Sequence, residues 1–274
     1  MNIIFFEQTT KEDIPLVGGK GASLGIMSHA GIPIPPGFIV TTEVYKNLFN
    51  KPFPSNIKNE ILQAFDSLGV ERVAVRSSAI AEDSTTSSWA GQLETCLNVT
   101  KANLIESIKK CWVSIQSERA KAYAQKQGLA DNQQTAVVVQ KMINSEISGV
   151  MFTVNPVTKN KDEIMLEAIY GLGEFLVQGM VTPYNYIINK RTLEVKSKTE
   201  GEQAIMLIYQ NENNQEIPLP INLQHAEILR TNDIKQLAKL GLQIEDIYKK
   251  PQDIEWAKEK EKFFIVQARP ITTL

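Results

Sequence analysis

The sequence predicts an α+β protein built from two lobes. In the first half of the chain, short apolar strands alternate with amphipathic helices, whereas the second half is a run of β-branched strands that ends with one long helix and a hairpin. A chain of 274 residues buries roughly three quarters of its unfolded surface. That is enough for one large domain or for two lobes, and we expect two lobes, residues 1–135 and 136–274.

In the first lobe, apolar runs and turn residues define the elements. The N-terminal run Ile3-Ile4-Phe5-Phe6 is short and has no positive flank, so it predicts a first strand and not a signal peptide. Thr41 or Thr42 is expected to cap a helix that reaches Phe49. The other elements expected in this lobe are a short helix ending near Gly31, an extended proline connector over 32–37, strands over 38–40 and 73–75, and helices over 56–68 and 101–127.

In the second lobe, β-branched segments predict a series of strands. Polar residues 211–214 are expected to form the turn of an exposed hairpin. The apolar stripe of a last helix over Thr231–Lys249 is expected to face the core. The strands are predicted over 135–143, 149–154, 164–168, 184–188, 193–197, 204–209 and 216–221, with a final hairpin over 253–257 and 263–270.

Composition excludes several classes of function. The chain has 29 basic and 31 acidic residues and a net charge of -2, so no basic excess indicates binding to nucleic acid or to a membrane surface. No apolar run approaches the length of a transmembrane helix. Cys96 and Cys111 are too few for a disulfide framework or a thiolate metal site. We expect free thiols and a cytoplasmic location.

A glycine-rich segment, Gly18-Gly19-Lys20-Gly21, precedes the first helix. Glycines leave backbone N–H groups unobstructed, and Lys20 adds one cation at a helix start, so the segment is able to cradle phosphate. It is not a Walker A sequence, and an ordinary turn is the alternative.

A second segment with phosphate-binding character follows the buried strand at 73–75. It begins with Arg76-Ser77-Ser78 and continues into a stretch of small residues and hydroxyls that contains Gly91. Such a loop is able to close over a phosphate chain and exclude water. The alternative is a surface loop in which Arg76 belongs to a structural ion pair.

The C-terminal hairpin carries the most informative pattern. Side chains on a strand alternate with a period of two, so Gln267 and Arg269 share one face, where Glu255 of the partner strand can meet them. Two oxygen donors beside a guanidinium suit Mg²⁺ and the phosphate tail of a nucleotide. An amphipathic hairpin with polar residues facing water is the alternative.

Taken together, these motifs resemble the ATP-binding domain of the phosphoenolpyruvate synthase and pyruvate phosphate dikinase family, which includes the rifampicin phosphotransferases. The resemblance covers essentially the whole chain in order. The motifs that carry it are Gly18–Leu24, Ile34–Phe38, Val75–Ser84, Ala90–Thr95, Val139–Met142, Gly171–Glu174, Pro251–Trp256 and Gln267–Thr272.

The resemblance implies an ATP-grasp-like fold with the nucleotide bound between two lobes. By position, Lys20 and Arg76 match phosphate-contacting cations, and Gly91 matches the phosphate loop. Further matches are Gln140 to Met142 with the hinge facing adenine, Glu255 and Gln267 with the metal ligands, and Arg269 with the cation on the terminal phosphates. Glu167 and Glu174 lie in a family motif and are expected either to contact nucleotide or to fix the lobe.

Members of this family use ATP and Mg²⁺ to move the β,γ-pyrophosphoryl unit onto a histidine of a separate swivelling domain, releasing AMP. The Thr-Ser-His-type motif of that domain is not found here, because neither His29 nor His225 has its context. We therefore expect a histidine-carrying partner in cis or in trans, and a structural or solvent-facing role for both histidines.

Two other functions compete with this phosphotransferase hypothesis. One is an ATP-binding sensor or scaffold that no longer transfers phosphate; the intact ligand positions favour the enzyme. The other is an ATP-grasp carboxylate ligase acting alone, which is disfavoured because the motifs match the dikinase branch. Related systems use pyruvate, an antibiotic, a glucan or another small molecule as the final acceptor, and the pocket for that acceptor is expected in a separate domain.

Overall fold

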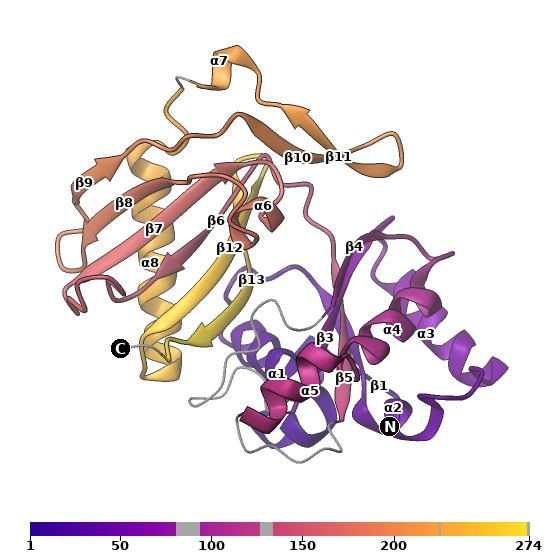
Figure 1. Cartoon of the computed structure of the whole chain (residues 1–274). Coiled ribbons are helices and arrows are strands. Elements are labelled where there is room, and N and C mark those ends of the chain that lie inside the picture. Colours follow the sequence, from indigo (N-terminus) through magenta and orange to yellow (C-terminus); the bar gives the residue numbers. More distant parts are fainter. Residues whose placement is uncertain (81–93, 127–133, 225, 273–274) are drawn as a thin grey trace. The chain divides into compact units, whose positions relative to one another are not determined.

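The computed structural model describes residues 1–80, 94–126, 134–224 and 226–272 (Figure 1). The chain divides into two compact units. Unit 1 comprises Met1–His29 and Pro35–Met142, and unit 2 comprises Ala30–Ile34 and Ile143–Leu274. The division follows Met142, not residue 135, because the strand that begins at Thr135 belongs to the sheet of unit 1. Each unit combines an antiparallel sheet with helices, which confirms the α+β class.

Unit 1 contains a five-stranded sheet with the order β1-β2-β5-β3-β4. Its strands are β1 (Ile3–Phe5), β2 (Gly37–Val40), β3 (Val73–Ala79), β4 (Thr95–Val99) and β5 (Thr135–Lys141). β5 is central and pairs with β2 and β3. All of β3 and all but the last residue of β5 are buried, which explains why β5 is a nearly continuous β-branched run without apolar–polar alternation.

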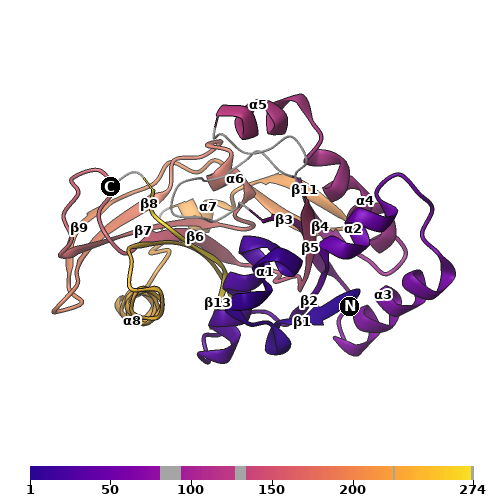
Figure 2. The ribbon, with the colours of Figure 1, turned by 90° about the horizontal axis from the view of Figure 1, so that it is seen from below.

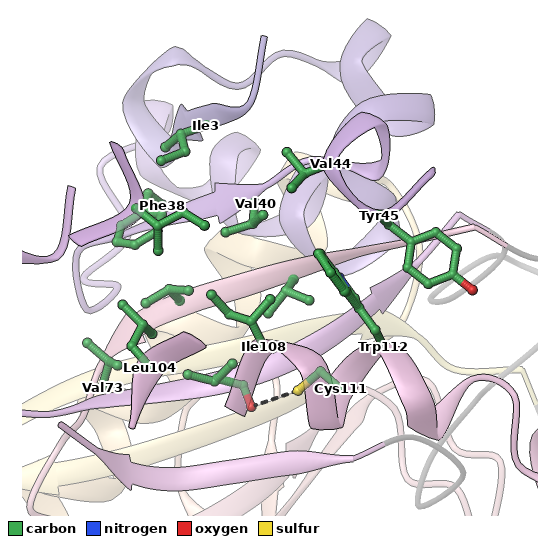
Figure 3. Packing of buried hydrophobic residues seen from close by; sticks show 14 of the residues in the cluster. Ile3, Phe38, Val40, Val44, Tyr45, Val73, Leu104, Ile108, Cys111 and Trp112 are labelled. Carbon is green, nitrogen blue, oxygen red and sulfur yellow. Dashed lines mark hydrogen bonds between the residues drawn. The ribbon is translucent and has the colours of Figure 1, made fainter. Parts of the chain in front are cut away.

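Helices cover both faces of this sheet. The helices of unit 1 are α1 (Ile14–His29), α2 (Thr42–Leu48), α3 (Ser55–Ser67), α4 (Leu104–Ser114) and α5 (Glu118–Lys126), with short 3-10 turns at Phe6–Gln8 and Lys11–Asp13. One face packs against α2, α3 and α4 in a core that includes Trp112, Tyr45 and Phe38 (Figure 3). On the other face, Gly21 of α1 packs against Ile39, where a Cβ atom would lie 3.1 Å from Cδ1.

The single helix expected over 101–127 is wrong, because the chain breaks between α4 and α5. Ser117 begins the new helix: its hydroxyl accepts the N–H of Ala120 at 3.2 Å, as an N-cap does. The break also changes the helical phase. Ala120 is fully buried, whereas Ala122, which a continuous helix would place on the apolar face, is exposed.

The prediction that a threonine side chain caps α2 is also wrong. Thr41 occupies the N-cap position, but its side chain does not cap the helix. Its hydroxyl instead donates to the carbonyl of Met1 at 2.9 Å, and that of Thr42 donates to the carbonyl of Pro15 at 2.7 Å. Both threonines therefore fix neighbouring segments to the start of α2.

Unit 2 contains a six-stranded sheet with the order β13-β12-β6-β7-β8-β9. Its strands are β6 (Ile147–Phe152), β7 (Glu163–Tyr170), β8 (Tyr184–Asn189), β9 (Val195–Thr199), β12 (Gln252–Glu259) and β13 (Lys262–Pro270). Beside this sheet lie a separate hairpin, β10 (Ile205–Gln210) and β11 (Asn213–Pro218), and the short helices α6 (Glu174–Val177) and α7 (Ile221–Gln224). Among the residues that the structure describes, no helix has the length and apolar character needed to cross a membrane.

The long helix α8 (Thr231–Tyr248) lies along one face of the six-stranded sheet, as the end-on view in Figure 2 shows. Gly241 lets the helix approach closely, since a Cβ atom there would lie 2.7 Å from Cε of Met151. Ile234, Leu237 and Ile244 are buried, which confirms that the apolar stripe of this helix is core. The opposite face of the sheet carries the polar side chains considered below.

The final hairpin has longer strands and a tighter turn than expected. Lys258 and Lys262, predicted to bound the link, lie within β12 and β13. The turn is made by Lys260 and Glu261, whose φ angles are 48° and 62°, as a two-residue hairpin turn requires. Lys258 is buried, and its ammonium group lies 3.3 Å from the carboxylate of Asp233 in the first turn of α8, which compensates its charge.

Candidate functional site

The glycine-rich segment forms a kink inside α1. Gly18 has φ 71° and ψ 173°, so the regular helix starts after it. A Cβ atom at Gly18 would lie 2.1 Å from the carbonyl oxygen of Ser78, so only glycine fits against β3. The N–H of Gly21, expected to be open for phosphate, donates to Ser78 Oγ at 3.1 Å. Because helix and strand lie so close together, the backbone N–H of Gly21, one of the donors expected to bind phosphate, is already used.

Lys20 is buried on the sheet side of this helix. Its side chain is 6% exposed, and its ammonium group donates to the carbonyl of Ser77 at 3.0 Å. This contact joins the glycine segment to the strand that carries Arg76. Two of the expected phosphate-contacting cations thus come from adjacent elements of unit 1.

Arg76 and Gln140 share the α1 face of the sheet in unit 1. Ala74 pairs with Gln140 and Arg76 pairs with Val138, so Arg76 and Gln140 are diagonal neighbours on the same face. Both residues are largely buried, at 9% and 2% exposed. The amide of Gln140 donates to the carbonyl of Pro35 at 3.4 Å.

At the expected adenine hinge, two backbone donors are already used. The N–H groups of Lys141 and Met142 donate to the carbonyls of Pro36 and Arg72, at 2.8 and 3.1 Å. A base at this hinge would therefore meet carbonyl oxygens and side chains. Gly91, the expected phosphate-loop residue, lies outside the described residues.

In unit 2, Glu255 of β12 lies directly opposite Gln267 of β13. The pairing predicted from the period of two is therefore observed. The same row continues across the sheet through Val150 to Glu167 and Asn185. This polar row lies on the face opposite α8, because Met151, which packs against α8, is offset by one residue from Val150.

The next row on this face pairs Arg269 with Asp253. The guanidinium donates from Nε and an Nη atom to one oxygen, Oδ2, of Asp253, at 2.9 and 2.7 Å. Sequence reasoning assigned Arg269 to phosphate and gave Asp253 no role. The missed signal was the same alternation that paired Glu255 with Gln267. Two residues earlier in β12 and two residues later in β13, it pairs Asp253 with Arg269.

Burial changes the acidity of two carboxyl groups on this face. Burial raises the pKa of Asp253, and repulsion from Glu255 adds to that shift, while Arg269 opposes it. Burial also raises the pKa of Glu167, against a hydrogen bond from Asn185. The face thus concentrates negative charge at a cost in solvation, which a bound cation would relieve.

The donor set on this face fits a hard cation. Glu255 and Gln267 supply a carboxylate and an amide oxygen, the donor types that Mg²⁺ accepts. Asp253 Oδ1 is buried and has no hydrogen-bond partner among the described atoms. In the part of the chain that the structure describes, no group of three or more His, Cys, Asp or Glu residues is arranged so that it could hold a metal ion, so a metal here would draw on the amide and on substrate oxygens.

The Gly171–Glu174 motif forms a tight turn after β7. Gly171 has φ 84°, and a Cβ atom there would lie 2.4 Å from the carbonyl of Leu207. Its own carbonyl accepts the hydroxyls of Ser145 and Ser148, at 3.1 and 2.7 Å. Glu174 begins α6. These contacts give the motif a structural role in unit 2, independent of any ligand.

Of the two histidines, the structure describes His29. A ring nitrogen of His29 lies 3.1 Å from the carbonyl oxygen of Thr9, which fixes the end of α1 to the preceding turn. His225 lies outside the described residues.

This chain is similar to known proteins over nearly its whole length. The family described as "Pyruvate phosphate dikinase, AMP/ATP-binding domain" matches residues 14–51 and 46–274. The "Phosphoenolpyruvate synthase" of Pyrococcus furiosus is 39% identical over 99% of this chain and 44% of its own length. The "Probable phosphoenolpyruvate synthase" of Methanocaldococcus jannaschii is 38% identical over 99% of this chain and 27% of its own length. The chain thus spans less than half of each of these two relatives.

Among solved structures, the D-alanine–D-alanine ligase of Bacillus anthracis aligns with 93% of this chain and 57% of its own, with a TM-score of 0.40 and 11% identity. The family match and the two synthases agree with the motifs from which the site was built. The chain belongs to the family of the pyruvate phosphate dikinase AMP/ATP-binding domain.

Proposed function

We propose that this chain is the ATP-binding part of a dikinase-type phosphotransferase, which passes the β,γ-pyrophosphoryl group of Mg·ATP to a histidine on a separate swivelling domain and releases AMP. The observation that carries the proposal is the paired register of the final hairpin. Glu255 faces Gln267, and Arg269 lies two residues further on the same face. Family membership supports the nucleotide, and the longer relatives support further domains.

Glu255 and Gln267 would hold the metal, and the orphaned oxygen of Asp253 lies in the adjacent row. Mg²⁺ bound there would neutralise phosphate charge and orient the tail. Asp253 holds the Arg269 guanidinium through Oδ2. The guanidinium would then reach the phosphate tail as a preoriented cation, which lowers the entropy lost on binding.

Lys20 and Arg76 would supply the cations of unit 1. Both side chains are largely buried, so their charges act in a medium of lower dielectric constant than water. Charge develops around the attacked β-phosphorus and its neighbouring oxygens, and fixed cations stabilise that charge without reorganising. The same argument gives these residues a role in the transition state and not in binding alone.

Calorimetry with ATP and Mg²⁺ tests the nucleotide site directly. Arg269→Ala should weaken ATP far more than AMP, because the guanidinium is assigned to the phosphate tail. Losing a charge-assisted contact costs about 1.5 to 3 kcal/mol, or roughly tenfold to a hundredfold in affinity. Arg191→Ala is the matched control, since Arg191 is 85% exposed and pairs with Asp162 at the surface of the same unit. Equal losses for ATP and AMP would contradict this placement.

Product analysis tests the reaction. The chain alone should form AMP only at a trace rate, with no phosphohistidine on His29 or His225. Adding the histidine-carrying domain of a phosphoenolpyruvate synthase should start AMP release and label that domain from β-³²P ATP. Binding without transfer to any such domain would favour the inactive sensor or scaffold, and release of ADP would favour a ligase-type reaction.

A further inference from the structure

Two thiols lie side by side in unit 1, in a place that the proposed phosphotransfer does not use. Cys96 is on β4 and Cys111 is on α4, and both are free thiols. Cys96 pairs across the sheet with Val75. The thiol of Cys111 donates to the carbonyl of that same Val75 at 3.5 Å, the contact drawn as a dashed line from Cys111 in Figure 3. Cys96 and Cys111 therefore both neighbour the same residue of β3.

The two thiols differ in access. Cys111 is fully buried in the core of unit 1, whereas Cys96 is half-buried. A cavity of about 280 Å³ opens on Cys96, and Ser107 and Lys110 of α4 line it. The cavity lies where β4 is irregular: its register against β3 shifts, and Asn98 has φ 55°. A small solute entering this cavity reaches Cys96 first.

The surroundings favour the thiolate at Cys96 and the thiol at Cys111. The hydrogen bond with Cys111 is the largest effect and lowers the pKa of Cys96 to about 7, and Lys110 adds to it, against burial and repulsion from Glu94. The same interaction and burial raise the pKa of Cys111. The accessible sulfur is therefore the one favoured as a thiolate, and the buried sulfur beside it is favoured as a thiol.

We propose that Cys96 and Cys111 form a peroxide-oxidisable dithiol, in which Cys96 is the attacking thiol and Cys111 the resolving thiol. The Cys96 sulfur attacks one oxygen of hydrogen peroxide: an S–O bond forms, the O–O bond breaks, and water leaves after taking up a proton. The Cys111 sulfur, losing its proton, then attacks the sulfenic sulfur, so that an S–S bond forms and a second water leaves. In total, two thiols and one peroxide give one disulfide and two waters.

The assignment is unambiguous in this chain because it has only these two cysteines. The test treats the whole chain with hydrogen peroxide, alkylates the remaining thiols and measures intact mass. We expect a monomer that is lighter by two hydrogens and carries no alkyl group. Two unmodified thiols, or Cys96 arrested as a sulfenic or sulfinic acid in the unsubstituted chain, would overturn the proposal.

Single variants separate the two roles. In Cys111→Ala, peroxide should leave a sulfenic acid on Cys96 that dimedone traps. In Cys96→Ser, the buried Cys111 should stay unoxidised and untrapped. Oxidation of Cys111 in Cys96→Ser at the rate seen in the unsubstituted chain would contradict the roles.

Reactivity toward iodoacetamide provides a readout that needs no disulfide. At pH 7, a thiol with a pKa of about 7 is half ionised, against a few per cent for an ordinary cysteine, so Cys96 should react several-fold faster than free cysteine. A rate equal to or below that of free cysteine would count against Cys96 as the attacking thiol. None of these measurements depends on nucleotide binding, so their outcome is separable from that of the proposed function.

Discussion

The guanidinium of Arg269 is held by the carboxylate of Asp253, with Nε and an Nη atom at 2.9 and 2.7 Å from Oδ2. Both side chains are mostly buried, at 19% and 13% exposed. Only one carboxylate oxygen takes part, and the other is buried without a hydrogen-bond partner among the described atoms. The pair thus fixes a cation on the polar face of unit 2 and leaves one oxygen available to a second cation.

Asp253→Asn should destabilise the protein and weaken ATP binding together. Asparagine keeps the shape but removes the charge that faces the guanidinium, and losing such a partly buried charged hydrogen bond costs about 1–3 kcal/mol. Chemical denaturation and calorimetry measure the two effects. Asp246→Asn is the control, because Asp246 pairs with Lys249 at the surface. The two side chains are 78% and 75% exposed. Equal losses of stability and of ATP affinity in the two variants would show that the Arg269–Asp253 pair contributes no more than a surface ion pair does.

Glu167 should make the protein less stable as the pH rises. Burial raises its pKa above 4.5 in the folded state, so the folded protein holds this proton more tightly than the unfolded chain does. Its contribution to the free energy of unfolding is fully present below pH 4.5 and is lost as the pH rises through the folded-state pKa. Glu167→Gln removes this loss.

Urea denaturation from pH 4 to about pH 7 measures the difference between the two proteins. We expect the free energy of unfolding of Glu167→Gln, relative to the unsubstituted protein, to increase with pH. A difference that is constant across this range would contradict burial as the cause.

Sequence reasoning succeeded where the pattern is local. The period of two within β13 was enough to place Gln267 and Arg269 on one face. The direct pairing of Glu255 with Gln267 also depends on a β-bulge, because the register between β12 and β13 shifts between Glu255 and Trp256. Irregularities were missed even where a signal existed. Ser117 followed by Glu118 is a helix start, but the apolar spacing on both sides suggested one continuous helix.

Contacts between segments that are distant in the chain could not be predicted from the sequence. Lys20 meets the carbonyl of Ser77 only because β3 lies under α1, and that placement depends on the order of strands in the sheet. The position of β5 between β2 and β3 likewise follows from the packing of the whole unit. A single sequence gives the apolar character of each strand but not which strand is its neighbour.

Gly18→Ala should disrupt the junction between α1 and β3. Alanine at φ 71° is strained, and its Cβ would also lie 2.1 Å from the carbonyl of Ser78. Backbone strain costs roughly 1–2 kcal/mol, and the overlap adds about 1–3 kcal/mol. Gly31→Ala is a matched control, since Gly31 has φ 73° but no atom within 4 Å of its added Cβ. Thermal unfolding should show a clearly larger loss for Gly18→Ala, and equal losses would mean that the close approach to β3 costs nothing.

Glu255→Gln should raise the Mg²⁺ concentration needed for ATP binding more than it weakens binding at saturating Mg²⁺. The substitution keeps an oxygen donor opposite Gln267 but removes its negative charge, and Mg²⁺ prefers carboxylate over amide oxygen. Calorimetric titrations of ATP at increasing Mg²⁺ separate the two effects. Glu216→Gln, an exposed substitution on the hairpin of β10 and β11, controls for the change in net charge. If Glu255→Gln and Glu216→Gln need the same Mg²⁺ concentration, Glu255 does not hold the metal, and its place beside Gln267 reflects only the packing of the hairpin.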